Sequence, residues 1–72
     1  MTLVERLTAI QKALGASDAE FARKLDIDAS LWNLVRNGKR DMGRKALRGV
    51  YKAFPELKDE IFEYTIAEPV VA

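Results

Sequence analysis

Cysteine and histidine are both missing from this chain of 72 residues. Without cysteine there can be no disulfide, no cysteine-ligated zinc and no thiol nucleophile. Without histidine the chain lacks the commonest general base and the commonest zinc ligand, so a Ser-His-Asp or Cys-His arrangement is excluded. We therefore expect a protein that is not an enzyme and that holds no metal and no other cofactor.

Long hydrophobic runs are also missing, since apolar residues follow one another only in twos and threes. This pattern predicts neither a membrane span nor the core of a signal peptide, and it favours a cytoplasmic protein. A composition with 49% hydrophobic and 32% charged residues is typical of a folded domain. The length allows one small domain, which we place at residues 1–65, followed by a tail at residues 66–72.

The net charge of +1 conceals an uneven distribution of charge along the chain. Residues 36–52 contain seven of the 12 lysines and arginines and a single acidic residue, Asp41. Residues 53–72 contain one base, Lys58, and the acids Glu56, Asp59, Glu60, Glu63 and Glu68. A concentrated basic segment can form a footprint for nucleic acid, whereas a solvated helix face is the plainer interpretation of the acidic segment.

The hydrophobic pattern is helical almost throughout and predicts an all-α bundle of about five short helices. Two capping boxes, Thr2 with Glu5 and Ser17 with Glu20, open the first two helices, and Gly15 ends the first. The expected buried faces of these helices consist of Leu3, Leu7, Ile10 and Leu14, and of Phe21, Ala22 and Leu25.

The next helices are separated by residues that favour turns. Asp26 is expected to take a left-handed backbone, with Ile27 pointing inward and Asp28 capping a third helix. That helix runs from about Ala29 to Asn37, ends at Gly38, and buries Trp32 and Val35. A fourth helix over about 43–54 buries Leu47, Val50, Tyr51 and Phe54, and a fifth opens at Pro55 with the stripe Leu57, Ile61 and Tyr64.

The segment from Ser17 to Arg40 resembles the helix-turn-helix of the phage repressor and Cro family, also called XRE-type. Ala22 stands where that family usually keeps a small residue, which lets the two helices cross closely. Asp26 departs from the glycine that is common at the turn. The family's apolar positions on both sides of the turn are matched by Leu25 and Ile27. The inward positions of the second helix of the motif are matched by Trp32 and Val35, and the glycine after that helix is matched by Gly38. The resemblance covers most of the chain and implies a lambda-repressor-like fold.

The resemblance also implies that the third helix lies in the major groove of DNA, where its N-terminal part meets base edges. The positions that match base-reading residues are Ala29, Ser30, Asn33 and Leu34. The positions that match phosphate-binding residues are Asn37, Lys39, Arg40 and Arg44. Asparagine can bond bidentately to adenine, and alanine or leucine can touch a thymine methyl group.

Charged residues depart from the family pattern at two places. Arg36 stands where relatives often have an acidic residue that pairs with a base of the first helix. The matching position here is near Gln11, so that pair is absent and Arg36 is expected to contact Glu5 or phosphate. Asp18 and Asp28 lie where DNA phosphates would approach. Their negative charge argues against direct phosphate binding by the N-termini of the second and third helices.

We interpret the chain as a sequence-specific DNA-binding transcriptional regulator that occupies an operator on double-stranded DNA. The alternative is a protein-interaction module on the same fold, antitoxin-like or adaptor, with Leu31 and Leu34 as apolar contacts. A homodimer on a palindromic operator is expected, because one short helix reads too few base pairs to select a site in a genome. Its contacts are expected at Phe62, Ile66, Val70 and Val71, within a fifth helix and a tail that is either disordered or a strand.

Overall fold

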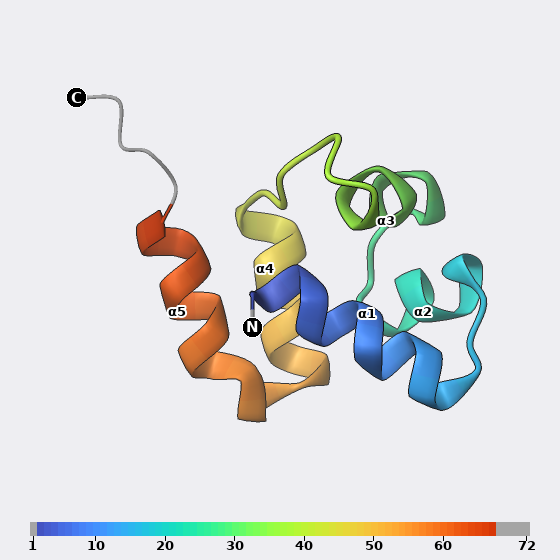
Figure 1. Cartoon of the computed structure of the whole chain (residues 1–72), viewed down its shortest axis with the longest axis horizontal. Helices are drawn as coiled ribbons and strands as arrows, with labels where there is room; N and C mark the ends of the chain where they lie inside the picture. The colour runs from blue at the N-terminus through green and yellow to red at the C-terminus, as the bar shows by residue number, and fades with distance from the viewer. Residues whose placement is uncertain (1, 68–72) are drawn as a thin grey trace.

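The computed structural model describes residues 2–67, which form five α-helices and one short 3-10 helix. In chain order these are α1 (Leu3–Leu14), α2 (Asp18–Lys24), α3 (Ala29–Arg36), α4 (Arg44–Ala53), η1 (Pro55–Leu57) and α5 (Lys58–Ala67). Figure 1 shows α1 crossing the middle of the bundle, with α2 and α3 at one end of the long axis and α5 at the other. The predicted all-α class is confirmed for this part of the chain.

Both predicted capping boxes are present. The Thr2 hydroxyl accepts a bond from the Glu5 backbone N–H (3.2 Å), and the Thr2 N–H donates to the Glu5 carboxylate (2.8 Å). Ser17 and Glu20 make the same two bonds at the start of α2. These bonds satisfy helix N–H groups that would otherwise lack partners, so both helices begin where the sequence indicates.

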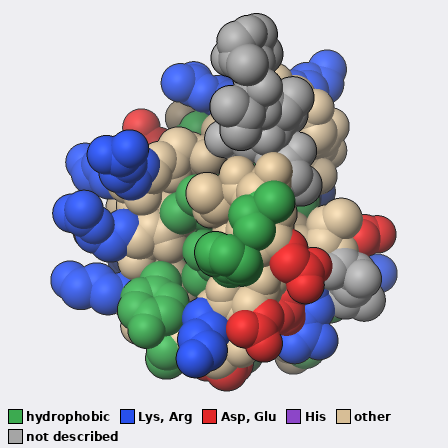
Figure 2. Space-filling view, turned by 90° about the vertical axis from the view of Figure 1, so that its left-hand side faces the viewer, with side chains coloured by type: hydrophobic (Ala, Val, Ile, Leu, Met, Phe, Trp, Pro, Cys, Tyr) green, Lys and Arg blue, Asp and Glu red, His purple; other side chains and the backbone are tan. Residues whose placement is uncertain are grey.

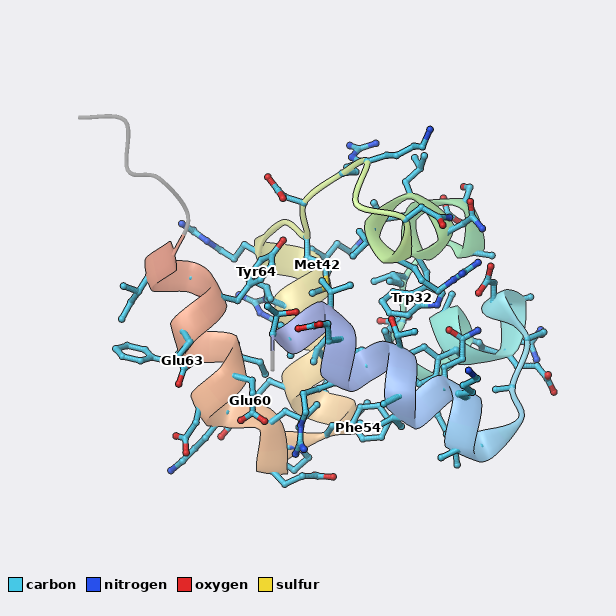
Figure 3. All side chains as sticks on the ribbon, in the orientation of Figure 1. Trp32, Met42, Phe54, Glu60, Glu63 and Tyr64 are labelled. Carbon is cyan, nitrogen blue, oxygen red and sulfur yellow. The ribbon has the colours of Figure 1, made fainter. Side chains whose placement is uncertain are left out.

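The core is built around Trp32, which is fully buried as predicted. Its ring lies 5.1 Å from that of Phe21, and Phe21 in turn stacks on the half-buried Phe54 at 6.0 Å. Figure 3 shows Trp32 pointing from α3 toward α1 and α2. The other buried apolar side chains are Leu3, Leu7, Ala22, Leu25, Val35, Met42, Ala46, Val50 and Leu57.

The buried face of α4 differs from the predicted one. Tyr51 is 51% exposed, so its assignment to the core is wrong. The residues that α4 buries are Ala46, Gly49 and Val50. A Cβ atom at Gly49 would overlap the carbonyl oxygen of Leu25, which means that α4 approaches the end of α2 through its smallest side chain. This close approach turns the larger Tyr51 outward.

Leu14 is a second correction, because it is 53% exposed although the pattern placed it on the buried face of the first helix. Burial along α1 fades from Leu3 and Leu7 to the half-buried Ile10. Leu14 occupies the last turn, next to Gly15, whose φ of 64° turns the chain toward α2. The last turn of α1 therefore lies at the edge of the bundle.

The fifth helix starts and ends differently from the prediction. Pro55 opens the 3-10 turn η1, and α5 follows from Lys58 to Ala67, so Ile66 is helical although it was counted with the tail. Residues 68–72, which include Val70 and Val71, lie outside the described residues. Two contacts of α5 are an ion pair between Arg6 and Glu60 (3.1 Å) and a bond from the Met42 N–H to the Tyr64 hydroxyl (2.8 Å). Figure 3 labels Glu60, Tyr64 and Met42.

Residues 2–67 contain neither a membrane-spanning helix nor a cluster of metal-ligating side chains. None of the helices there combines the length and the apolar character that crossing a bilayer requires. The same residues contain no group of acidic side chains arranged to hold a metal ion.

Candidate nucleic-acid interface

The turn between α2 and α3 fixes how these two helices cross. Asp26 has a φ of 58°, the left-handed backbone that the sequence predicts. The Ile27 N–H then donates to the Ala22 carbonyl (3.0 Å), which closes the turn. Ala22 and Leu25 are buried at the crossing, so a small side chain and a tight turn bring α3 close to α2.

The N-terminal end of α3 is held by backbone rather than by a side chain. Asp28 is the N-cap residue, as predicted, but its side chain makes no capping bond. Instead, the backbone carbonyl of Asp28 accepts a bond from the backbone N–H of Trp32 (3.0 Å). At the other end α3 stops at Arg36, one residue before the predicted end, and Gly38 takes a φ of 73°. The Asp28 carboxylate is therefore left on the exposed surface.

The outward face of α3 carries the predicted base-reading residues, because Trp32 and Val35 occupy the inward face. Ser30 and Asn33 are exposed. Leu34 is 36% exposed, and Ala29 is half-buried against the core. Of these positions, Ala29 therefore offers the least surface to a partner.

A hollow of about 810 Å³ opens beside α3, between α2 and the start of α4. It brings together four of the predicted site residues, Ala29, Ser30, Leu34 and Arg40. The rest of its lining is Ala19, Arg23, Asp26, Ile27, Asp28, Leu31, Lys45 and Ala46. Arg23, Arg40 and Lys45 thus place three cations around the outward face of α3.

Arg23 and Lys45 were not among the predicted contacts. The signal for Lys45 was its place in the basic segment 36–52. The signal for Arg23 was weaker, since a basic residue in the last turn of a helix is also explained by the helix dipole. Asp26 and Asp28 line the same hollow, so its charge is mixed rather than uniformly positive.

Asn33 does not line this hollow and points toward the N-terminus of α2. Its side-chain N–H donates to the Asp18 Oδ2 atom at 3.0 Å. The same carboxylate accepts bonds from Gln11 (2.8 Å) and from Arg36 through Nε (3.2 Å) and Nη2 (2.9 Å). Gln11 in turn accepts a bond from the Trp32 indole N–H (2.8 Å). One carboxylate thereby links α1, α2 and α3.

This network corrects the prediction for Arg36. Its contact within the chain is a two-pronged ion pair with Asp18 rather than with Glu5. Glu5 is engaged by Thr2 in the first capping box. The bonds from Arg36, Gln11 and Asn33 hold the pKa of Asp18 well below its ordinary value. Asp18 is therefore charged at neutral pH, and the guanidinium of Arg36 offsets much of that charge.

The four predicted phosphate-binding residues are all exposed, but they do not form one cluster. Asn37 donates from its side chain to the Asn33 carbonyl (2.8 Å), and the Lys39 N–H donates to the Leu34 carbonyl (2.9 Å). Asn37 and Lys39 therefore stay close to α3. Arg40 lines the hollow beside α3, whereas Arg44 lines a second hollow between α4 and α5.

Comparisons with known protein families, with curated proteins and with solved structures give no match for this chain.

Proposed function

We propose that this protein is a sequence-specific DNA-binding transcriptional regulator that occupies its operator with α3 in the major groove. The observation that carries the proposal is the pairing of an exposed polar face on α3 with the cations around it. Ser30 and Asn33 lie on that face, and Arg40 borders it. A basic surface beside a helix-turn-helix is the usual footprint of a DNA-binding domain.

Base recognition is assigned to the exposed part of α3. The Asn33 amide donates one N–H to Asp18, and its oxygen accepts a long bond from the Asn37 side chain (3.5 Å). Its second N–H and the other lone pair of the oxygen can serve adenine N7 and N6. Ser30 can donate or accept, and Leu34 can contact a thymine methyl group. Asp18 and Asn37 thus hold the Asn33 amide at the exposed surface of α3.

Phosphate binding is assigned to the loop after α3 and to the start of α4. Lys39, Arg40 and Arg44 are exposed there, and Asn37 stays beside the end of α3. Such contacts position a protein on the duplex without reading its sequence. Arg23 and Lys45, which border the hollow beside α3, extend the same basic surface.

Salt dependence of DNA binding tests this assignment. Because phosphate contacts release counterions, affinity for duplex DNA measured by fluorescence anisotropy should fall steeply between about 50 and 200 mM salt. The triple variant Lys39→Ala, Arg40→Ala, Arg44→Ala should weaken binding to all sequences and reduce the salt slope by roughly 0.9 per lost contact. Lys12→Ala with Lys58→Ala, which removes cations from α1 and α5, serves as the control. An unchanged slope in the triple variant contradicts the assignment.

A protein-interaction module is the second candidate, and one observation favours it. The hollow beside α3 has an apolar part, Leu31 and Leu34, flanked by the carboxylates of Asp26 and Asp28. Carboxylates repel phosphate, whereas they suit a protein partner with basic and apolar side chains. Salt separates the two functions, since an apolar protein contact persists at concentrations that remove DNA.

A further inference from the structure

Asp28 is an exposed carboxylate that makes no contribution to the fold through its side chain. It is the N-cap residue of α3, a position where aspartate ordinarily accepts a bond from a backbone N–H of the helix. Its side chain makes no such bond, although Thr2 and Ser17 both do so at the starts of α1 and α2. Neither of the two ion pairs within residues 2–67 involves its carboxylate. The carboxylate is therefore available to a ligand.

The other acids of the helix-turn-helix segment each have a structural explanation. Asp18 accepts the bonds that link α1, α2 and α3. Glu20 completes the capping box with Ser17. Asp26 has the left-handed φ of 58° that closes the turn, a conformation that aspartate tolerates better than most residues. Asp28 is the one acid among residues 17–36 whose side chain has no such task.

The position of Asp28 puts it among the residues assigned to base recognition. It directly precedes Ala29, the first residue of α3, and it lines the hollow beside that helix together with Ser30 and Leu34. The N-terminal residues of a recognition helix are the ones that meet base edges. On the proposed function, on which this inference rests, the Asp28 carboxylate therefore faces the floor of the major groove.

A carboxylate in the major groove discriminates among the four bases because it only accepts hydrogen bonds. Guanine and thymine offer acceptors there, whereas cytosine and adenine offer an amino group. Adenine places the N7 acceptor beside its amino group, and this lone pair repels a carboxylate. Cytosine has no acceptor of its own in the major groove, so its N4 amino group is the partner that fits best.

We propose that Asp28 reads a cytosine of the operator by accepting a hydrogen bond from the N4 amino group. Repulsion between the carboxylate and nearby phosphates would oppose this contact, but the hollow also holds three cations that offset it. These are Arg23, Arg40 and Lys45. Asp28 then contributes to the choice of sequence rather than to affinity for DNA in general.

The cytosine lies at a different position from the base that Asn33 reads. Asn33 donates to Asp18 at the N-terminus of α2 and does not line the hollow beside α3. Asp28 lines that hollow and is five residues away, which corresponds to about 7.5 Å along a helix axis. The two side chains therefore specify separate base pairs of one half-site.

Selection of bound sites from random duplex DNA tests the proposal by comparing the intact chain with Asp28→Asn. The intact chain should enrich cytosine at one position of each half-site. Asparagine has nearly the same shape as aspartate, but its amide can bond bidentately to adenine. Asp28→Asn should therefore change the preferred base at that position from cytosine to adenine and leave the other positions unchanged. Asp26→Asn is the matched control, because it removes the same charge from the same hollow and asparagine also tolerates a left-handed backbone.

A duplex with one altered base measures the same hydrogen bond directly. The enriched site is compared with a copy in which 2-pyrimidinone, which lacks the N4 amino group, replaces the cytosine. In fluorescence anisotropy, the intact chain should bind the altered duplex about tenfold more weakly. Asp28→Ala should bind the two duplexes equally. Circular dichroism should show the same helix content for all variants, because both aspartates are exposed.

The outcomes separate this proposal from the proposed function. A motif whose base preferences are the same for the intact chain and Asp28→Asn overturns the role of Asp28 and leaves DNA reading by α3 in place. So does a variant that binds all sequences more tightly by the same factor, because the carboxylate would then only repel phosphate. A change of motif that Asp26→Asn also produces overturns it too. An intact chain that enriches no motif contradicts the proposed function itself, and the role of Asp28 with it.

Discussion

The α2–α3 pair and the α4–α5 pair use their polar groups in opposite ways. Around α2 and α3, Asp18, Arg36, Gln11 and Asn33 satisfy one another, and the Trp32 N–H joins the same network. Around α4 and α5, exposed bases and acids lie around exposed apolar side chains (Figure 2).

This difference separates a surface that is already organised from one that is incomplete. A network that fixes α3 against α1 and α2 limits the motion of the residues that would meet base edges, which lowers the entropic cost of recognition. Exposed apolar area would gain free energy if a partner covered it. The first region is therefore the better candidate for reading DNA, and the second for assembly.

The largest expected effect is on the core of the first region. Trp32→Ala should cost about 3–5 kcal/mol, against a total stability of roughly 5 kcal/mol for so small a domain, so the variant should be mostly unfolded. Tyr51→Ala removes an aromatic ring from the second region and should cost far less, because that ring is 51% exposed. Urea unfolding followed by circular dichroism compares the two. Equal losses of stability would contradict the assignment of Trp32 to the core.

A smaller effect is expected where the two regions meet. Gly49→Ala would ordinarily stabilise a helix by up to about 1 kcal/mol. Here the added methyl group overlaps the Leu25 carbonyl, so we expect a loss of about 1–3 kcal/mol in thermal or urea unfolding. Gly43→Ala adds the same methyl group in open space and should change stability by less. A neutral or stabilising Gly49→Ala would show that α4 does not pack closely on the end of α2.

The smallest change in the free energy of unfolding is expected on lowering the pH. It distinguishes a carboxylate of the first region, Asp18, from a carboxylate of the second region, Glu63. The pKa of Asp18 lies below its ordinary value of 3.8, so the folded protein binds that proton less readily than the unfolded chain. The stability that Asp18 contributes is therefore present above its unfolded pKa and is lost as pH falls through its folded pKa. Asp18→Asn should destabilise the protein at about pH 7 and progressively less below about pH 4.

Glu63→Gln is the matched control for that titration. Glu63 is exposed and takes no part in either ion pair of residues 2–67, so its replacement should change the stability of the monomer little at both pH values. An Asp18→Asn variant whose loss of stability is the same at all pH values would contradict a charge-dependent role for Asp18.

Local sequence signals predicted most of the fold. Thr2 with Glu5 and Ser17 with Glu20 marked two helix starts, Asp26 marked the turn, and Trp32 marked the core. In each of these cases the interacting groups are close in the sequence or the side chain is too large and apolar to leave exposed. Such signals do not depend on how the helices are arranged in space.

Predictions failed where the outcome depends on packing between helices. The apolar spacing on α4 placed Tyr51 on the buried face, but the helix is buried through Ala46 and Gly49, whose small size permits close approach. Arg36 finds its partner at Asp18 across the turn between α2 and α3, a contact that depends on how those helices cross. Met42 lies outside the predicted helix stripes, yet it is buried and its backbone N–H donates to the Tyr64 hydroxyl of α5.

Selection of bound sites from a random DNA library tests the central claim, that α3 reads DNA sequence, most directly. The intact chain should enrich a palindromic motif whose half-sites lie about 34–36 Å apart. A second selection with Asn33→Ala should lose the preference at one position of each half-site, with about 1–3 kcal/mol less affinity for the original motif and little change on random DNA. No enriched motif, or the same motif bound equally well by both proteins, would contradict the account.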